Sequence, residues 1–470
     1  MIHIKGINEA MKIPVEKNKE YVVEIVDNGA EGEGIAKIDN FTIFIPEAIK
    51  GEKVKVLIVK VLSSHAFGKI VEMIKTSKHR TRIDCPTYKR CGGCNLRHID
   101  YEETLNMKRE KVQNLVRKNM KTDLIVEPTI GMGIPYYYRN KAQYPLGINK
   151  NGQAVIGVYA KRSHEIIPMD NCEIQHKISE QIAKFIYYYI KDNCISIYDE
   201  TTGKGIFRHI VIKLGVQTNE IMCILVINGE SFPKEKELVK LLIKEFPSIK
   251  TIVKNINKKN TNVILGKENI NIYGDGYITD ILGDYQFKIS PNSFYQVNPT
   301  QTEILYNTAI EMSDLDTEGA NVALDLYCGI GTIGIFISKY VNEVYGIEIV
   351  EQAIEDAKEN AKMNHVNNIH FIAGDVEKAL TELIEKQKVN PDIVFVDPPR
   401  KGLDRVTIAN LLKIKPKKIV YISCNPATLT RDLAILEEEY QVNRIQPVDM
   451  FPFTSHIETV TVLTLKSQGL

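Results

Sequence analysis

The stretch Ala-Leu-Asp-Leu-Tyr-Cys-Gly-Ile-Gly-Thr at residues 323–332 decides the fold of the C-terminal part of this chain. It is an apolar run that passes into a glycine turn, and the apolar segment 333–340 behind it predicts a helix. From residue 298 onward, strand-like and helix-like segments alternate, which is typical of a doubly wound parallel sheet. We therefore predict a Rossmann-like α/β domain over residues 286–470.

Acidic residues mark the ends of three successive strands in this predicted domain. Asp325 precedes the glycine turn, Glu348 ends the next strand, and Asp375 ends the third. An acid about 20 residues after a glycine turn commonly binds ribose hydroxyls. The turn reads Gly-x-Gly-Thr and lacks the third glycine of the dinucleotide fingerprint, so a nucleoside without phosphates fits better. S-adenosylmethionine meets that description, and the alternative is a structural turn with exposed acids.

Reactive side chains follow two further apolar runs. Cys424 comes after the run 419–422, and Asp397 comes after Val394-Phe395-Val396, while His456 and Glu458 lie near the end of the chain. Open α/β sheets place their ligands at the carboxyl ends of the strands. A thiol, a carboxylate and a second base at that edge indicate covalent catalysis with proton removal. The alternative is a packed structural cysteine, because free cysteine is among the most buried residue types.

A crowded set of cysteines lies outside this domain. Cys85, Cys91 and Cys94 fall within ten residues, and Cys172 is the candidate that completes a set of four. Disulfides are rare in the cytosol, so this crowding favours a metal site. Four thiolates bind either zinc or an iron–sulfur cluster, and the spacing does not decide between them.

The N-terminal part of the chain has a different pattern. Residues 14–74 alternate with period two in short segments separated by glycines, which predicts a small OB-like β-barrel. Such barrels often bind oligonucleotides, but a fold alone does not establish a function. Residues 75–285 mix strands and helices and predict a central α+β domain that contains the cysteine set. An amphipathic helix is expected over residues 101–119, packed on the catalytic domain.

The composition is that of a globular protein. The chain has 470 residues, of which 44% are hydrophobic and 25% charged. No apolar stretch approaches the roughly 20 residues that cross a bilayer, and the segment Met1–Gly6 lacks the apolar core of a signal peptide. We expect a cytoplasmic protein with no membrane association and no evident obligate protein partner. The net charge of +1 excludes a polybasic nucleic-acid binder.

With these motifs assembled, the chain resembles the RNA uracil-C5 methyltransferase family, in particular its bacterial 23S rRNA branch, which carries a TRAM domain. The resemblance covers nearly the whole chain. It rests on collinear motifs at Gly32–Gly34, Cys85–Cys94, Tyr138–Lys141, Ser293–Asn298, Asp325–Gly329, Asp397–Arg400, Ser423–Pro426 and His456–Glu458.

The resemblance implies S-adenosylmethionine-dependent methylation of uracil C5 in 23S rRNA. It assigns cofactor contacts to four residues, namely Gln296, Tyr327, Glu348 and Asp397. Cys424 is the implied nucleophile and Glu458 the proton acceptor, with His456 as its supporter because residues i and i+2 of an extended segment share a face. The four cysteines are implied to hold a [4Fe–4S] cluster, with zinc as the alternative.

Three other functions remain open at this point. A tRNA substrate competes with 23S rRNA, although tRNA enzymes of the family usually lack the barrel and the cysteines. Methylation of an amino group would need no nucleophilic Cys424, and a non-catalytic RNA-binding protein would need neither site. Arg139, Lys141 and Arg208 are candidate RNA contacts, and a target base would have to leave its stack to reach the thiol.

Overall fold

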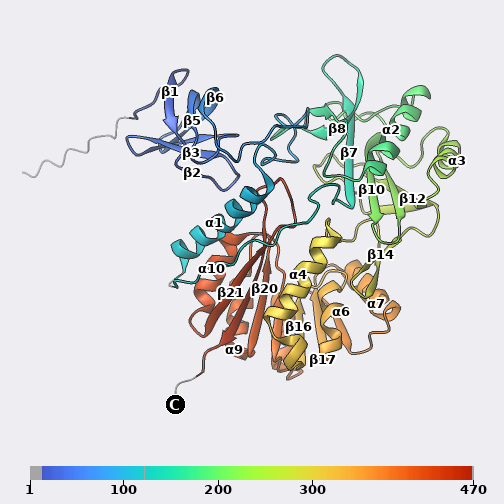
Figure 1. Cartoon of the computed structure of the whole chain (residues 1–470). Helices are drawn as coiled ribbons and strands as arrows, with labels where there is room; N and C mark the ends of the chain where they lie inside the picture. The colour runs from blue at the N-terminus through green and yellow to red at the C-terminus, as the bar shows by residue number, and fades with distance from the viewer. Residues whose placement is uncertain (1–12, 121, 468–470) are drawn as a thin grey trace, which may run out of the picture. The chain divides into compact units, whose positions relative to one another are not determined.

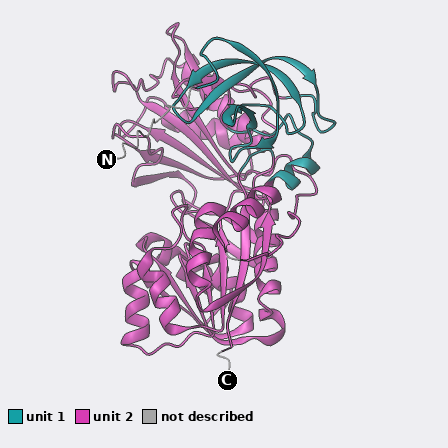
Figure 2. Cartoon of the chain, turned by 90° about the vertical axis from the view of Figure 1, so that its left-hand side faces the viewer, with its two compact units in different colours: residues 1–84, 93–107, 453–455 teal, residues 85–92, 108–452, 456–470 magenta. Residues whose placement is uncertain are grey.

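The computed structural model describes residues 13–120 and 122–467 (Figure 1). The segment Met1–Gly6 lies outside them. The described chain forms two compact units, coloured separately in Figure 2. Unit 1 holds residues up to 84, 93–107 and 453–455, and unit 2 holds the remainder. The domain boundaries expected from the sequence stay predictions. None of the helices in the described residues is long and apolar enough to cross a membrane.

Unit 1 contains a small closed barrel. Its strands are β1 (Glu20–Glu24), β2 (Asp27–Asn28), β3 (Gly34–Ile38), β4 (Phe41–Ile45), β5 (Lys53–Val61) and β6 (His65–Lys75). They are ordered β1-β5-β6-β4-β3-β2. Because β1 and β2 are successive parts of one segment, the two ends of the sheet meet, and the Val26 N–H donates to the Ile35 carbonyl at 2.8 Å. This closure confirms the predicted barrel.

The first sheet of unit 2 is mixed. Its strands are β7 (Lys141–Ile148), β8 (Ala154–Tyr159), β9 (Ile166–Pro168), β10 (Phe207–Gly215), β11 (Glu220–Ile227), β12 (Ile249–Ile256) and β13 (Glu268–Tyr273). One face is covered by α2 (Lys177–Asp192) and α3 (Glu235–Glu245), whose apolar residues join the core of this sheet. The hairpin of β14 (Ile278–Leu282) and β15 (Tyr285–Ile289) follows.

The second sheet of unit 2 carries the predicted catalytic residues. Its strands are β16 (Ala320–Leu326), β17 (Val341–Glu348), β18 (Ile369–Ala373), β19 (Ile393–Val396), β20 (Lys418–Ser423), β21 (Tyr440–Val448) and β22 (Glu458–Leu465). The order is β18-β17-β16-β19-β20-β22-β21, and β22 is antiparallel to its neighbours. This arrangement confirms the predicted doubly wound α/β domain.

Helices cover both faces of this sheet. They are α1 (Tyr101–Asn119), α4 (Pro299–Met312), α5 (Leu315–Glu318), α6 (Thr332–Ile337), the 3-10 turn η1 (Ser338–Tyr340), α7 (Glu351–Met363), α8 (Val376–Glu385), α9 (Arg405–Ile414) and α10 (Pro426–Leu436). The α1 range is the one predicted, and its Val112 and Val116 are fully buried in the core beneath α8, α9 and α10. These two residues of α1 therefore share a core with the helices of this sheet.

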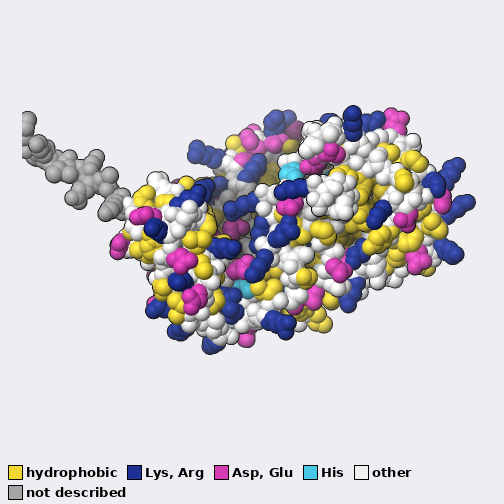
Figure 3. Space-filling view, turned by 90° about the horizontal axis from the view of Figure 1, so that it is seen from above, with side chains coloured by type: hydrophobic (Ala, Val, Ile, Leu, Met, Phe, Trp, Pro, Cys, Tyr) yellow, Lys and Arg dark blue, Asp and Glu magenta, His cyan; other side chains and the backbone are white. Residues whose placement is uncertain are grey.

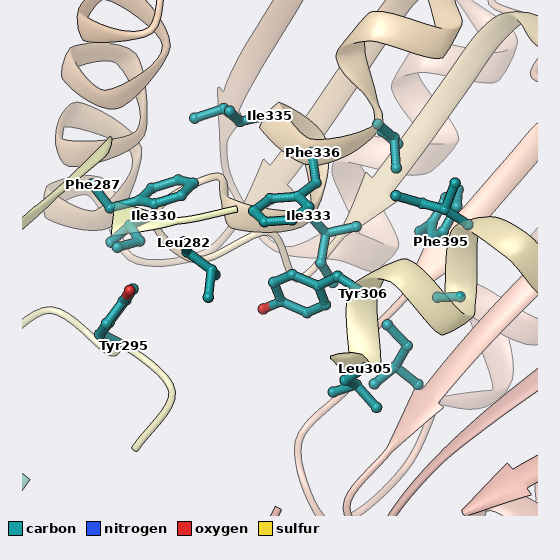
Figure 4. Close-up of a cluster of buried hydrophobic side chains, with 14 of the residues drawn as sticks. Leu282, Phe287, Tyr295, Leu305, Tyr306, Ile330, Ile333, Ile335, Phe336 and Phe395 are labelled. Carbon is teal, nitrogen blue, oxygen red and sulfur yellow. The ribbon is translucent and has the colours of Figure 1, made fainter. Parts of the chain in front are cut away.

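A single apolar core joins the second sheet of unit 2 to the hairpin β14–β15. Figure 4 shows Phe287, Phe336 and Tyr306 gathered in it, and the rings of Tyr306 and Phe336 have centroids 5.3 Å apart. Burying one large apolar side chain contributes about 1.5–3 kcal/mol. This core therefore fixes α4 and α6 beside the strand ends that bear the candidate site.

Candidate active site

The carboxyl ends of β16 and β19 lie at the point where the strand order reverses. The sheet grows through β17 and β18 on one side of this pair and through β20 on the other. Open α/β sheets bind their ligands at such a switch point. Leu326 pairs with Val396, so Tyr327 and Asp397 leave the sheet side by side.

The glycine turn after β16 leaves room for a ligand against the backbone. Gly329 has a φ of +55°, and a Cβ placed there would meet nothing within 4 Å. Gly331 has a φ of +81°, and a Cβ there would lie 2.8 Å from the ring of Phe371. The first glycine therefore faces open space and the second is required by packing.

Asp325 is fully buried at the end of β16. Its Oδ2 accepts a hydrogen bond from the Gly334 N–H at 2.8 Å, which ties the strand to α6. Its Oδ1 has no hydrogen-bond partner among the described residues. Burial raises the pKa of Asp325 to about 7, against the lowering effect of the Gly334 N–H. An unpartnered buried acceptor of this kind calls for a donor from a ligand.

Glu348 and Asp375 end the neighbouring strands as predicted. Glu348 is half-buried and accepts hydrogen bonds from the N–H groups of Gly329, at 3.2 Å, and Val350, at 3.0 Å. Asp375 is exposed at the start of α8. Burial raises the pKa of the Tyr327 phenol to about 12, and the Asp375 charge contributes to that rise. The structure thus brings Glu348, Asp375 and Tyr327 to one edge.

Gln296 reaches the same domain from the segment before α4. It is half-buried, and its backbone carbonyl accepts a hydrogen bond from the Asn140 amide at 2.9 Å. Asn298, which is buried, caps α4 by accepting from the Gln301 N–H. Asn and Pro at a helix start are strong local signals, so the position of this segment follows from the sequence.

Cys424 and Glu458 lie beside each other at the ends of the neighbouring strands β20 and β22. Ser423 and Thr459 form the last pair between β20 and β22, and Cys424 and Glu458 are the residues directly beyond that pair. The Glu458 charge acts on the Cys424 thiol, so the two side chains lie near each other. The segment after Cys424 starts α10, where Asn425 caps the helix by accepting from the Ala427 N–H. The structure therefore brings the predicted nucleophile and base together.

Acidic charges surround this pair. Burial raises the pKa of the half-buried Cys424 thiol to about 11, and the charges of Glu458 and Asp397 add to the rise. Burial also raises the pKa of Glu458 well above its ordinary value, with a further contribution from Asp397. Burial raises the pKa of Asp397 to about 7. With no ligand present, the thiol is protonated at neutral pH.

Arg400 is the cation that opposes this acidity. Its charge lowers the pKa values of both Cys424 and Glu458. The Asn425 amide donates to the Arg400 carbonyl at 2.9 Å and joins the loops of the thiol and of Asp397. Arg431 is ion-paired with Asp432 and donates to the carbonyls of the 401–403 segment, so its charge is already matched.

His456 occupies a different position from Glu458. It is exposed and precedes β22, and its ring centroid lies 6.0 Å from that of Phe451. Glu458 is only 4% exposed. His456 and Glu458 would share a face only if both lay in an extended strand, and the strand begins at Glu458. The geometry therefore favours Glu458 as the residue beside the thiol.

Two features of the site were missed by sequence reasoning. Tyr306 of α4 is fully buried and donates to or accepts from the Thr332 hydroxyl at 3.1 Å, and the charges of Asp397 and Glu458 help raise its pKa. The second is a buried ion pair between Lys108 of α1 and Asp449, just beyond β21. Neither has a local signal, because each depends on segments that are far apart in the sequence.

Cys85, Cys91 and Cys172 approach one another in unit 2. Burial raises the pKa of Cys172, and the charges of Cys91 and Cys85 contribute. Cys94 belongs to unit 1. In the part of the chain that the structure describes, no group of three or more His, Cys, Asp and Glu side chains is arranged to hold a metal ion. The metal site therefore remains a prediction.

Arg208 is not an RNA contact. Its side chain is buried, and its guanidinium donates at 2.7 Å to the carbonyls of Asn257 and Lys259 and lies over the ring of Tyr198. The sequence-based expectation was wrong because an arginine that caps loop carbonyls has the same local pattern as a surface arginine.

Comparisons with known proteins agree with this arrangement. A family model described as tRNA (uracil-5-)-methyltransferase matches residues 100–466, and a TRAM domain model matches residues 14–71. The chain is 48% identical to an uncharacterized RNA methyltransferase of Clostridium acetobutylicum, over 96% of this chain and 98% of the relative. It is 44% identical to one of Halalkalibacterium halodurans, over 97% and 99%.

A solved structure matches over nearly the full length. It is the crystal structure of the Pyrococcus abyssi tRNA (uracil-54, C5)-methyltransferase in complex with S-adenosyl-L-homocysteine. The TM-score is 0.76 at 27% sequence identity, and the match covers 95% of this chain and 100% of the other. The family resemblance noted from the motifs is confirmed.

Proposed function

The chain belongs to the tRNA (uracil-5-)-methyltransferase family, and from this premise we propose that it methylates C5 of a uridine in RNA through a covalent Cys424 adduct. The observation that carries the proposal is the position of Cys424 and Glu458 directly beyond the last pair of β20 and β22, with Asp397 close enough to act on the thiol. A nucleophile and a base beside one another serve addition and later proton removal on a single ring.

The residues at the switch point fit S-adenosylmethionine as the methyl donor. The open space at Gly329 admits a ligand, and the unpartnered Asp325 Oδ1 needs a donor. Glu348 has lone pairs left for ribose hydroxyls after its two backbone bonds. Gln296, Tyr327, Asp375 and Asp397 complete the proposed contacts. When bound, the cofactor supplies an electrophilic methyl group on a positively charged sulfur.

Cys424 activates the uracil ring in the proposed reaction. Uracil C5 is a weak nucleophile until the thiolate adds to C6, which forms the S–C6 bond and moves the C5–C6 π electrons toward C5 and O4. C5 would then take the methyl group as the bond from that methyl to the donor sulfur breaks and leaves a neutral thioether, and the Glu458 carboxylate removes the remaining C5 proton. Elimination breaks the S–C6 bond, restores the C5–C6 double bond and returns the thiolate.

Arg400 has a supporting role in this sequence. The Cys424 thiol, with a pKa of about 11, must ionise beside two acids, Glu458 and Asp397. The Arg400 cation lowers this pKa. Because the thiolate is the reactive form, the rate of adduct formation should rise with pH between 7 and about 11.

The proposed substrate is 23S rRNA, and tRNA is the second candidate. The 23S proposal rests on the motif resemblance. The Pyrococcus abyssi tRNA enzyme aligns with 95% of this chain, a span that cannot leave out the whole barrel and cysteine segment. The presence of these modules therefore does not distinguish the two substrates, which corrects the inference made from the sequence.

One experiment separates these substrates from each other and from the non-catalytic alternative. Wild-type protein and Cys424→Ala are incubated with methyl-labelled S-adenosylmethionine and either 23S rRNA or total tRNA, and the methylated nucleotides are mapped. We expect 5-methyluridine in 23S rRNA with the wild type only. Label in tRNA alone would favour the second candidate, and label transferred equally by Cys424→Ala would exclude the covalent reaction.

We also propose that Cys85, Cys91, Cys94 and Cys172 hold a [4Fe–4S] cluster, with zinc as the alternative. The crowding of Cys85, Cys91 and Cys94 within ten residues of the sequence supports the donor set. Bound there, a cluster would supply a structural link between distant segments. Protein purified without oxygen should contain about four iron atoms and four sulfides per chain. One zinc without sulfide would favour the alternative. A protein that contains neither iron nor zinc would contradict the proposed metal site.

A further inference from the structure

Three aromatic side chains gather on the barrel of unit 1. They are Phe44 of β4 and His65 and Phe67 of β6, and we call them the barrel aromatic cluster. The ring centroids are 5.4 Å apart for Phe44 and His65, 5.2 Å for His65 and Phe67, and 5.9 Å for Phe44 and Phe67. Phe44 and Phe67 are directly paired across parallel strands. The planes of these two rings differ by 33°.

The cluster lies on the outer face of the barrel. Ile43 and Ala66, which alternate with the cluster residues, are fully buried in the barrel core. Successive side chains of a strand point to opposite faces, so the cluster points outward. Phe44 and Phe67 are half-buried and neither belongs to the barrel core nor packs against it. Core packing therefore does not account for the two rings.

Lysines surround the cluster on the same face. Lys37 of β3 pairs with Thr42, Lys60 of β5 pairs with Phe67, and Lys69 lies two residues beyond Phe67 on β6. All three are exposed, and within the described residues none of them forms an ion pair. The acid of β6, Glu72, lies beside Lys55 instead. The patch therefore combines ring faces with unmatched positive charge.

We propose that the barrel aromatic cluster stacks unpaired bases of a single-stranded RNA segment, while Lys37, Lys60 and Lys69 contact its phosphates. Aromatic rings beside cations are the elements with which proteins bind single strands without reading the sequence. A duplex keeps its base faces stacked and offers no partner for the rings. A protein partner with an apolar surface would cover the rings but would leave the three lysines without opposite charges. The proposal rests on the proposed function for its RNA and extends it to a second contact with the substrate.

Binding of a labelled uridine oligonucleotide of about 15 residues to the full chain tests the stacking. Phe44→Leu/Phe67→Leu keeps apolar volume without an aromatic face, and we expect its Kd to rise about ten-fold or more. Phe44→Tyr/Phe67→Tyr should bind within about two-fold of the wild type, because the ring faces remain. The matched control is Val22→Ala/Val71→Ala, which alters two exposed apolar side chains of the same barrel and should bind normally. Unchanged affinity of the leucine variant, or an equal loss on an RNA duplex, overturns the proposal.

The lysines are tested separately by the salt dependence of binding. For single strands, log Kd changes with log salt concentration by about 0.7 for each phosphate contact. Lys37→Gln/Lys60→Gln/Lys69→Gln should therefore lower the slope by up to about 2. These side chains are exposed, so the variant tests the patch even if the leucine variant folds poorly. An unchanged slope overturns the phosphate contacts.

Methylation assays separate this inference from the proposed function. The leucine and glutamine variants should raise KM for the RNA and leave kcat at saturating RNA unchanged, because the barrel residues do not belong to the catalytic site. If wild-type protein methylates no RNA but the binding differences persist, the proposed function fails and the stacking site stands. If methylation is intact and the variants bind and turn over as the wild type does, the stacking site fails alone.

Discussion

Two aspartates at opposite ends of the same short strand behave in opposite ways. Asp392 precedes β19, and its pKa is lowered overall. Burial raises this pKa, but the Lys417 ammonium and the N–H groups of Val322 and Asn321 together lower it by more. Asp397 follows β19, and burial raises its pKa to about 7. Four residues of one strand therefore separate a satisfied carboxylate from one held in an unfavourable environment.

The same contrast holds along the two edges of the sheet. At the amino edge, Lys418 donates to the carboxylates of Asp314 and Glu318, both at 2.9 Å. At the carboxyl edge, Asp325, Asp397 and Glu458 all have raised pKa values. Perturbed acids concentrate at functional sites, where charge is matched by a ligand rather than by the protein. One edge of this sheet thus carries matched ion pairs, and the other carries the proposed catalytic site.

Removing the nucleophile should have the greatest effect. Cys424→Ala is expected to lower methylation by roughly 10⁴-fold or more, because the uracil ring is no longer activated. Thermal stability should change little, since the side chain is half-buried at a strand end. Methylation by labelled transfer and a thermal melt check both points. Cys328→Ala, a buried cysteine of the glycine turn, is the control and should keep the covalent chemistry.

Glu458→Gln should trap the reaction after methyl transfer. The amide cannot remove the C5 proton, so we expect turnover to fall by roughly 10²–10⁴-fold and a protein–RNA adduct to accumulate. Denaturing gel electrophoresis with labelled RNA detects it. His456→Gln is the comparison variant, and its turnover should fall less, because His456 is exposed. Normal turnover by Glu458→Gln without an adduct would show that another group is the base.

Replacing each of the two aspartates that flank β19 by asparagine sharpens the contrast between the two ends of the strand. Asp397→Asn should lower kcat/KM strongly without loss of stability, because a half-buried charge in an unfavourable environment is removed. Asp392→Asn should keep activity and lose about 1–3 kcal/mol of unfolding free energy, because its charged bonds weaken. Activity assays and denaturant unfolding give both quantities. Equal losses of activity in the two variants would contradict the assignment of catalysis to the carboxyl end of β19 alone.

The pH dependence of stability has opposite signs at these two aspartates. The raised pKa of Asp397 means that the folded state binds its proton more tightly, so stability falls as pH rises from about 4 to about 7. The lowered pKa of Asp392 contributes stability above about pH 4, which is lost as pH falls through the folded value. Unfolding curves of Asp397→Asn should therefore show a flatter decline between pH 4 and 7.

The smallest effect is expected from Lys418→Met at the amino edge. Its two carboxylate partners are exposed, and surface ion pairs of this kind contribute about 0–1 kcal/mol. Activity should remain within about two-fold of the wild type, since the substitution lies at the opposite end of β20 from Cys424. A large loss of activity here would mean that the two edges are coupled.

Local patterns predicted much of the fold and the strand-end positions of Cys424 and Asp397. The α1 range follows from its periodicity, and Cys424 and Asp397 follow from apolar runs that end in turn residues. The meeting of Cys424 with Glu458 could not be read locally, because it requires β22 to insert beside β20. The family resemblance supplied that role instead.

Other parts of the site could not be predicted for physical reasons. Tyr306 is an ordinary core residue of α4 until the fold brings strand-end acids toward it. Lys108 and Asp449 are 341 positions apart and pair only in the folded chain. Arg208 shows the reverse error, in which a charged residue expected at the surface is buried against carbonyls. Tertiary partners decide each of these cases.

A covalent bond between Cys424 and the target base is what distinguishes this mechanism from every alternative. RNA containing 5-fluorouridine at the target position tests for it, because fluorine at C5 cannot leave as a proton and the adduct persists. After reaction with S-adenosylmethionine and proteolysis, mass spectrometry should find the methylated fluoropyrimidine nucleotide on the peptide that contains Cys424. An unmodified Cys424 peptide, from protein that still methylates ordinary RNA, would contradict the mechanism.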